Sequence, residues 1–410
     1  MKRFLKIIIL VVCLITPFFS ISVSGEDTVT DSVRFSPDFV KVSVVVAAPG
    51  DTLYSTFGHT AIRMQCPSLK MDYCFSYNME SNTLAYLQFL AGQANSFWEA
   101  VPTSVYIQQF KKEGRGITQY NLNLTPQEKS ELWRRLDIGI QDGTGHKFNL
   151  LKNNCTTVCM QEIEACLIDE YIETPTYPAE LLWKNGVILQ YASRYSPWYQ
   201  FLYQTVSGTE ADITWPLVYR IIPEVVGKYL TASVIKSVDG KSVRPLLKDP
   251  PQILQKNTRK EWQCPVTPDI LFSCLLILVI LVTVLEWKPG WKLPAHWTDY
   301  VLFTLQSVIG IFLLYITLMG SILGRHWNWV LIPLNPLPLF LWLLYRRRSN
   351  FERIYLVYTV ILVVFIVVAP FVANQIQPGH QLIAASLAVR CLSRYLQFRG
   401  IKKNNNCTNK

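Results

Sequence analysis

The residues Asn153-Asn154-Cys155-Thr156-Thr157 mark the start of a predicted helix that runs to Leu167. They place Cys155 in its first turn, where exposed backbone N–H groups and the helix dipole favour a thiolate. The pKa of this thiol is therefore predicted to fall below its usual value of about 8.5. The flanking asparagines and threonines supply hydrogen-bonding groups that a purely packed cysteine does not need, so Cys155 is a candidate nucleophile.

A base for this cysteine is expected in Phe57-Gly58-His59-Thr60-Ala61-Ile62-Arg63. A neighbouring imidazole is the usual means of activating a thiol. Gly58 lets the backbone approach a neighbour closely, and the ring of His59 is expected to face away from the core. Spacing alone leaves open the alternative that Cys155 is a buried small residue and His59 a histidine satisfied within a strand.

Local patterns predict the elements that carry these residues. The valine-rich residues 40–46 predict a strand that ends at the turn-forming residues 47–51. Strands over 59–64 and 71–77 are predicted to pair in a hairpin whose first member presents His59. Thr125-Pro126-Gln127-Glu128 combines a capping box with a proline at the first helical position, which predicts a helix to about residue 138.

The chain has 410 residues, half of them hydrophobic, and its composition divides it into parts. Residues 1–24 have a basic start, an apolar run and small residues, which predicts a signal peptide or an N-terminal anchor. Residues 25–262 mix charged and apolar residues as a soluble domain does. Residues 263–399 are predicted to form a transmembrane domain, and residues 400–410 a disordered cytoplasmic tail.

Five segments of the predicted transmembrane domain have about the length that crosses a hydrocarbon core of ~30 Å. Basic residues cluster in the connections that would then lie inside, which is the positive-inside pattern. Arg390 and Arg394 lie in the final turns of the last segment and are expected to snorkel to the surface. The five predicted spans are 269–285, 300–323, 329–345, 354–373 and 380–396.

The formal net charge of +10 does not by itself predict a nucleic-acid partner. Much of the positive excess lies in short clusters beside apolar runs, such as Arg346-Arg347-Arg348 and Lys402-Lys403. Such clusters are typical of membrane topology signals. We therefore expect a membrane-embedded protein and no nucleic acid.

The ten cysteines do not predict a disulfide framework in a chain of this length. Cys66 and Cys74 flank the hairpin turn, and a bridge between them is left open, because it needs an oxidising compartment and close Cα atoms. Cys159 and Cys166 share a helical face with Cys155 and are expected in the core. A zinc site from Cys155, Cys159 and His146 would lack a close ligand pair and a fourth ligand, so no metal is expected.

Other polar residues lie near these motifs. Asp51, Tyr54 and Ser55 are expected to form a polar support near His59, or simply a turn and its cap. His326 and His380 lie at predicted membrane ends, where an anchor at the interface is the first expectation and a role beside the active site is the lesser alternative.

A histidine on a strand that precedes Asn-Cys at a helix start resembles the circularly permuted branch of the papain-like fold, to which NlpC/P60-related enzymes belong. More closely, residues 49–63, Glu113-Gly114-Arg115 and residues 153–157 look like the periplasmic domain of Lnb-type lipoprotein N-acyltransferases of Bacteroidota. His326-Trp327-Asn328-Trp329 with residues 333–337 is similar to the transmembrane module of that family. The resemblance implies an α+β class, with a permuted papain-like periplasmic domain followed by an all-α multi-pass transmembrane domain.

The resemblance further implies acyl transfer at the bacterial inner membrane, with the catalytic domain in the periplasm. Cys155, activated by His59, would take an acyl chain from a membrane phospholipid as a thioester and pass it to the α-amine of a lipoprotein's diacylglyceryl-cysteine. The resemblance implies no cofactor. A third catalytic group is expected from Ser76 or Asn78. The residues expected to bind substrate or support the site are Asp51, Tyr54, Ser55, Arg63, Arg115, Asn154 and His326.

Three other functions remain open from the sequence. A cell-wall amidase or endopeptidase of the NlpC/P60 type could use the same cysteine and histidine. A non-catalytic membrane module of the envelope would need neither. A phospholipase or thioesterase would share the first half-reaction and use water as the acceptor.

Overall fold

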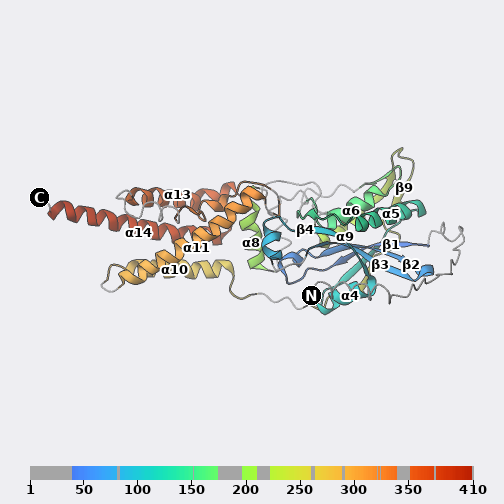
Figure 1. Cartoon of the computed structure of the whole chain (residues 1–410), viewed down its shortest axis with the longest axis horizontal. Helices are drawn as coiled ribbons and strands as arrows, with labels where there is room; N and C mark the ends of the chain where they lie inside the picture. The colour runs from blue at the N-terminus through green and yellow to red at the C-terminus, as the bar shows by residue number, and fades with distance from the viewer. Residues whose placement is uncertain are drawn as a thin grey trace, which may run out of the picture.

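The structure, a computed structural model, describes residues 39–80, 84–150, 152–173, 196–209, 222–259, 264–288, 291–320, 322–323, 325–338, 351–373 and 375–408. The predicted signal segment over 1–24 lies outside these residues. The molecule is elongated, with a sheet domain at one end and a group of long helices at the other (Figure 1). Helix α8 (Pro197–Ser207) lies between the two parts.

A seven-stranded antiparallel sheet forms the centre of the first part, in the strand order β10-β5-β1-β2-β3-β4-β6. A second sheet of three strands has the order β7-β8-β9. The strands of the large sheet are β1 (Lys41–Ala47), β2 (His59–Cys66), β3 (Met71–Met79), β4 (Asn95–Pro102), β5 (Ile117–Asn121), β6 (His146–Lys147) and β10 (Gln252–Gln255). Those of the small sheet are β7 (Glu170–Glu173), β8 (Val234–Ser237) and β9 (Val243–Pro245).

Helices cover both faces of the large sheet, α5 (Pro126–Asp142) and α6 (Cys155–Ala165) on one and α4 (Thr103–Lys112) on the other (Figure 1). Successive residues of a strand point to opposite faces. Ile62 accordingly packs in the core beneath α5 and α6, whereas its neighbour Ala61 packs in a second core with residues of α4. Strand β2 therefore borders both cores, and its first residue is His59.

The local signals of the soluble part are confirmed. Strands β1, β2 and β3 form where the sequence predicts them, and β2 pairs with β3 as a hairpin. Helix α5 begins with the predicted capping box, in which the Thr125 side chain accepts from the backbone N–H of Glu128 and the Glu128 side chain accepts from the backbone N–H of Thr125. Cys159 and Cys166 lie in the core, as expected for residues on the inner face of α6.

The bridge between Cys66 and Cys74, left open from the sequence, is not formed, and both thiols are free. The hairpin register explains the difference. Cys66 lies opposite Met71, and Cys74 lies opposite Arg63, so the two cysteines are several positions out of register with each other. The turn at 67–69 is a short 3-10 helix that sets this register.

Among the described residues, three helices have the length and composition to cross a membrane: α10 (Pro268–Leu285), α11 (Lys292–Met319) and α13 (Phe351–Val372). They correspond to the first, second and fourth predicted spans. The third predicted span begins in a 3-10 turn at Trp329–Leu331 and then continues beyond residue 338, outside the described residues. Helix α14 (Pro378–Thr408) contains the fifth and packs along α10 and α13.

Two expectations for the last helix are wrong. Arg390 does not snorkel, because its side chain is fully buried and its partners Glu286 and Asp299 lie inside the helix bundle. Arg390 and Arg394 also interrupt the apolar run of α14, so α14 is not among the helices with the composition of a span. The predicted disordered tail instead continues the last helix as far as Thr408.

Polar contacts join the two parts at α8. The Asn328 side chain donates to the carbonyl oxygen of Thr205 at 2.8 Å, and the Thr205 hydroxyl lies 2.9 Å from Nε2 of His380. The ring of His380 stacks on Phe201 with centroids 4.5 Å apart. Residues of α8 and of the helical part therefore form one buried junction.

Candidate active site

A cavity of about 600 Å³ opens at the end of the large sheet where β2 begins, and both Cys155 and His59 line it. The cysteine comes from the first turn of α6 and the histidine from the first position of β2. The next residue in each element is a threonine, and a hydrogen bond of 2.9 Å between the hydroxyl groups of Thr60 and Thr156 joins β2 to α6. The two residues that the sequence singles out from positions nearly a hundred apart thus share one cavity.

The start of α6 is fixed by Asn154. Its side-chain oxygen accepts from the backbone N–H groups of Thr156 and Thr157, both at 2.8 Å, and its nitrogen donates to the carbonyl of Leu150. Asparagine is among the best residues for this N-cap position. The cap thus bonds the N–H groups of the two residues that follow Cys155 and does not use the N–H of Cys155 itself.

Gly58 allows the approach to His59. Its φ of +93° is a conformation that residues with a Cβ rarely adopt, and an added Cβ would lie 2.7 Å from the carbonyl oxygen of Ala47. The close backbone approach expected at Gly58 is therefore present. It lets the chain enter β2 directly beside β1, with His59 at the mouth of the cavity.

The His59 ring is held by a chain of hydrogen bonds that runs along β3 and ends on β4. Nε2 of His59 lies 2.5 Å from Oγ of Ser76, Ser76 donates to Oδ1 of Asn78 at 2.9 Å, and Asn78 donates to a carboxylate oxygen of Glu99 at 2.6 Å. A hydroxyl has one proton to donate. Because Ser76 donates to Asn78, it accepts from His59, so we assign the proton of the neutral imidazole to Nε2. Nδ1 is then the atom that can take a proton.

The surroundings of His59 keep the ring neutral. It stacks on Phe110 and lies near Tyr106, with ring centroids 6.2 and 6.4 Å away. Burial, and after it the positive charge of Arg115, lowers the pKa of His59 from 6.5 to about 3. The imidazole is therefore uncharged at neutral pH and available as a base.

The prediction of a lowered pKa for Cys155 is wrong. Burial raises the pKa of this thiol, and hydrogen bonds from the backbone of Thr60 and from Thr156 only partly offset that effect. The helix terminus that motivated the prediction is present, but desolvation of the thiolate outweighs it here. Cys155 and His59 thus form a thiol–imidazole pair in which both groups are neutral at rest.

This neutral pair predicts the pH dependence of thiol alkylation. The rate at which iodoacetamide alkylates Cys155 in the full chain should rise about tenfold per pH unit from pH 6 up to about pH 9, since the thiolate is the reactive form. Peptide mass spectrometry of the modified Cys155 measures the rate. A His59→Ala control should show the same slope. A plateau between pH 5 and 8 that disappears in the control would indicate a thiolate–imidazolium pair instead and contradict the prediction.

Arg115 is the main positive charge of the cavity. Its side chain is buried, donates to the carbonyl oxygen of Ala48 at 2.6 Å and to Glu113 at 2.9 Å, and lies over the ring of Phe110 at 4.5 Å. The remaining nitrogen, Nη2, has no hydrogen-bond partner within the described part of the chain. A buried donor of this kind can donate a hydrogen bond to an anionic or carbonyl group in the cavity.

The cavity brings together most of the residues predicted for the site. Asp51 is largely exposed at its edge and lies 3.6 Å from Arg259, and Ser55 is buried and bonded within its turn to Thr52. The lining includes all four predicted catalytic residues and five of the predicted supporting ones, namely His59, Ser76, Asn78, Cys155, Asp51, Tyr54, Ser55, Arg115 and Asn154.

Two predicted residues lie elsewhere. Arg63 is on β2 but does not line the cavity, and it pairs with Asp72 on β3 at 2.6 Å and with Gln119 on β5. His326 does not line the cavity either, and its Nε2 lies 2.9 Å from the carbonyl oxygen of Val206 in α8. Arg63 thus bonds across the sheet, and His326 lies at the junction with the helical part.

Several residues of the site are not predicted from the sequence. Glu99 ends the hydrogen-bond chain because it lies opposite Ser76 in the register of β3 and β4, which no local pattern reveals. Tyr106 and Phe110 form the aromatic wall because α4 presents them one turn apart on its buried face. Their spacing of four is the helical signal that could have identified that face.

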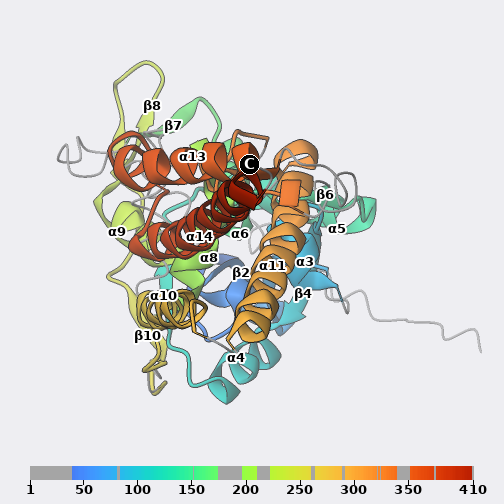
Figure 2. The same cartoon turned by 90° about the vertical axis from the view of Figure 1, so that its left-hand side faces the viewer.

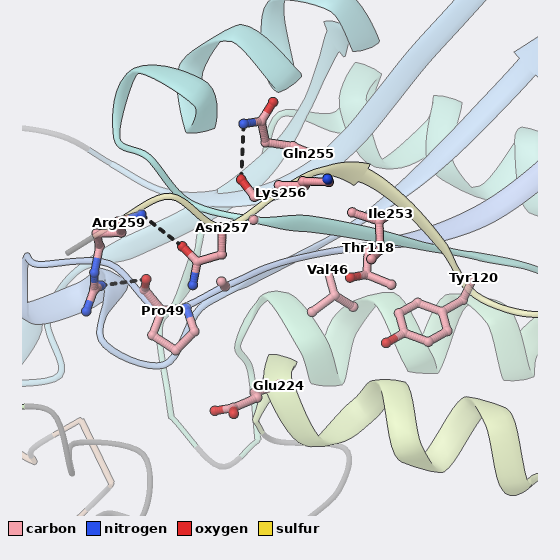
Figure 3. A pocket seen from close by; sticks show the side chains of 12 residues that line it. Val46, Pro49, Thr118, Tyr120, Glu224, Ile253, Gln255, Lys256, Asn257 and Arg259 are labelled. Carbon is pink, nitrogen blue, oxygen red and sulfur yellow. Dashed lines mark hydrogen bonds between the residues drawn. The ribbon is translucent and has the colours of Figure 1, made fainter. Parts of the chain in front are cut away.

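A second cavity, of about 560 Å³, lies beyond the turn at 49–51 (Figure 3). Arg259 stands at its edge and donates to the carbonyl oxygen of Pro49 at 2.6 Å. Its lining has neither a cysteine nor a histidine, and its charged side chains are Glu224, Lys256 and Arg259. This cavity has no groups for the thiol chemistry of the first.

The fold and the site define a class of protein, an α+β domain that presents a cysteine and a histidine in one cavity and is joined to membrane helices. Residues 30–182 match the family model of the Lnb N-terminal periplasmic domain, and residues 258–401 match that of the Lnb transmembrane domain. The chain therefore belongs to the Lnb-type proteins, membrane proteins of the lipoprotein-maturation type. No curated protein and no solved structure matches the chain.

Proposed function

We propose that this chain is a lipoprotein N-acyltransferase that uses Cys155 as its nucleophile. The observation that carries the proposal is the pairing of Cys155 with an oriented His59 in a cavity of an Lnb periplasmic domain. The donor is a membrane phospholipid and the acceptor is the α-amine of the N-terminal diacylglyceryl-cysteine of a lipoprotein. The domain lies in the periplasm, on the multi-pass helical part in the inner membrane.

In the first half-reaction the thiol of Cys155 gives its proton to Nδ1 of His59 as the sulfur attacks the ester carbonyl of the phospholipid. The new C–S bond forms, the ester C–O bond breaks, and the lysophospholipid alcohol leaves with the proton from His59. Ser76, Asn78 and Glu99 orient and stabilise the imidazolium that forms in between. The N–H of Cys155 and Nη2 of Arg115 are the donors proposed for the oxyanion.

In the second half-reaction the amine of the lipoprotein attacks the thioester. The C–N bond forms, the C–S bond breaks, and the amine proton returns to the sulfur through His59. An α-amine has a pKa near 8, so part of it is neutral at pH 7 and needs no strong base. The aromatic wall of Tyr106 and Phe110 excludes water from the thioester, which favours the amine as the acceptor.

The test is the mass of a lipoprotein's N-terminal lipopeptide from cells that lack their own N-acyltransferase. Cells supplied with the intact chain should add one amide-linked acyl group, and cells supplied with the Cys155→Ala variant should add none. Membrane fractions confirm that both proteins reach the membrane. Cys159→Ala, which removes a thiol one helical turn away in the core, is the matched control and should retain transfer.

Each other result points to a different function. Acylation by both the intact chain and the Cys155→Ala variant would make Cys155 structural and refute the mechanism. Acylation by neither, with both in the membrane, would favour a cell-wall amidase or a non-catalytic envelope module. Release of free fatty acid by the intact chain without lipopeptide acylation would identify a phospholipase or thioesterase.

A further inference from the structure

Four exposed apolar or aromatic side chains lie together beside the cavity, and we call them the membrane-side lip: Tyr54, Leu84, Tyr86 and Leu87. Their exposed fractions are 47%, 56%, 48% and 53%. The rings of Tyr54 and Tyr86 are 5.7 Å apart at their centroids, and Leu84 and Leu87 flank Tyr86 at the start of α3. Grouped exposed apolar side chains next to a cavity are typical of an interaction surface.

The membrane-side lip is joined to the catalytic cavity through α3 (Ala85–Leu90). Ala85 and Phe89 lie one turn apart on the inner face of this helix and line the cavity with Cys155, whereas Tyr86 and Leu87 point outward. Tyr54 belongs to both, since it lines the cavity and is half exposed. An apolar path therefore leads from the surface of α3 to the nucleophile.

The C-terminal end of α3 and the turn that follows it contact the end of a membrane helix. The backbone N–H of Ile322, just after α11, donates to the carbonyl of Leu90 at 3.3 Å, and the side chain of Gln93 donates to the carbonyl of Met319 at 3.5 Å. Figure 2, which views the molecule from the helical end, shows α3 beside α11. The last residues of α11, Leu318 and Met319, are themselves exposed. The membrane-side lip thus lies mostly on a helix whose C-terminal end is bonded to the exposed, apolar end of α11.

We infer that the membrane-side lip takes the acyl chain of a phospholipid out of the periplasmic leaflet and guides it into the cavity of Cys155. This inference rests on the proposed function, because it names the route of the proposed acyl donor. An acyl chain that leaves the bilayer loses its apolar surroundings, which is unfavourable for every CH₂ group that becomes exposed to water. Leu84, Leu87 and the two tyrosine rings replace part of those surroundings along the path.

The first experiment tests the contact without any turnover. The full-length Cys155→Ala protein is reconstituted in phosphatidylethanolamine vesicles that contain a phospholipid with a photoreactive diazirine on its acyl chain. After illumination, the peptide that spans residues 84–93 should carry the lipid, whereas the peptide that spans the β8–β9 hairpin should not. Equal labelling of the two peptides, or none on residues 84–93, would overturn the inference.

The second experiment tests the route. Leu84→Gln combined with Leu87→Gln changes two exposed side chains outside the catalytic machinery, and Val238→Gln combined with Val243→Gln makes the matched change on the hairpin between β8 and β9. Mass spectrometry of the intact protein follows the thioester on Cys155. With vesicle phospholipid as the donor, the leucine pair should form the thioester at least about tenfold more slowly than the unmodified chain, and the valine pair at the same rate.

A soluble donor, p-nitrophenyl butanoate, separates the outcomes, because its short chain needs no path out of a bilayer. The leucine pair should react with it at the rate of the unmodified chain. Undiminished reaction with vesicles, or an equal loss with both donors, would overturn the inference. If the unmodified chain forms no thioester with either donor, the proposed function fails, and the labelling experiment alone decides whether the lip contacts lipid.

Discussion

Replacement of His59 by alanine should slow formation of the Cys155 thioester by about 10²- to 10⁴-fold, the range typical for loss of a general base. Burial raises the pKa of Cys155, so almost no thiolate exists at pH 7 without a base that accepts the proton during attack. The effect should appear in kcat and in kcat/KM alike, because His59 acts only as the transition state forms. Mass spectrometry of the acylated protein, with a soluble ester as donor, measures the rate.

The control for this variant is His146→Ala. His146 is an exposed histidine on the edge strand β6 of the same sheet and does not line the cavity, so its removal should leave the rate unchanged. A His59→Ala protein that forms the thioester as fast as the unmodified chain would show that the base is another group. The hydrogen-bond chain behind the ring would then have no catalytic role.

Substitutions along the hydrogen-bond chain behind His59 should slow thioester formation by graded amounts. Ser76→Ala removes the acceptor for Nε2 of His59, and a buried hydrogen bond left unmade costs about 1–3 kcal/mol, which corresponds to about 5- to 150-fold in rate. Glu99→Gln keeps an oxygen that can accept from Asn78, so it should lose less than Glu99→Ala. If Glu99→Ala forms the thioester as fast as the unmodified protein while Ser76→Ala is slower, the hydrogen-bond chain that supports His59 ends at Asn78.

The parts of the site that the sequence predicts depend on short-range signals. The cap by Asn154, the hairpin that presents His59 and the glycine before it involve residues within a few positions of one another. Glu99 could not be predicted in this way, because its place depends on the register between β3 and β4. The pKa of Cys155 could not be predicted for a related reason, because the burial that raises it is a tertiary effect. Tyr106 and Phe110 of α4, which line the cavity, are distant from Cys155 in the sequence.

The same limit applies to the membrane part. A lone arginine in an apolar segment predicts snorkelling when nothing nearby in the sequence can pair with it. The partners of Arg390 are Glu286 at the end of α10 and Asp299 in α11, which lie 104 and 91 positions away. Neither carboxylate has a local pattern that marks it as buried. Only the packing of α14 against α10 and α11 shows that these charges belong together.

This buried cluster predicts a large effect on stability. Arg390 donates to Asp299 at 2.5 Å, to Glu286 at 3.0 Å and to the hydroxyl of Thr283 at 2.7 Å, and its side chain has no exposed surface. Arg394 pairs with the same two carboxylates, so two positive and two negative charges balance. Arg390→Met would leave two buried carboxylates with one arginine, and removal of one partner from a buried ion pair typically costs about 3–5 kcal/mol.

The free energy of unfolding of the full chain in mixed micelles, followed by tryptophan fluorescence, measures this cost. Arg399→Met is the matched control, because it removes an exposed arginine from the same helix and should cost less than about 1 kcal/mol. Arg390→Met combined with Asp299→Asn should recover part of the loss, since Arg394 and Glu286 then remain as one balanced pair. If Arg390→Met were no more harmful than Arg399→Met, the cluster would not hold α10, α11 and α14 together, and hydrophobic packing along α13 and α14 would have to supply that stability instead.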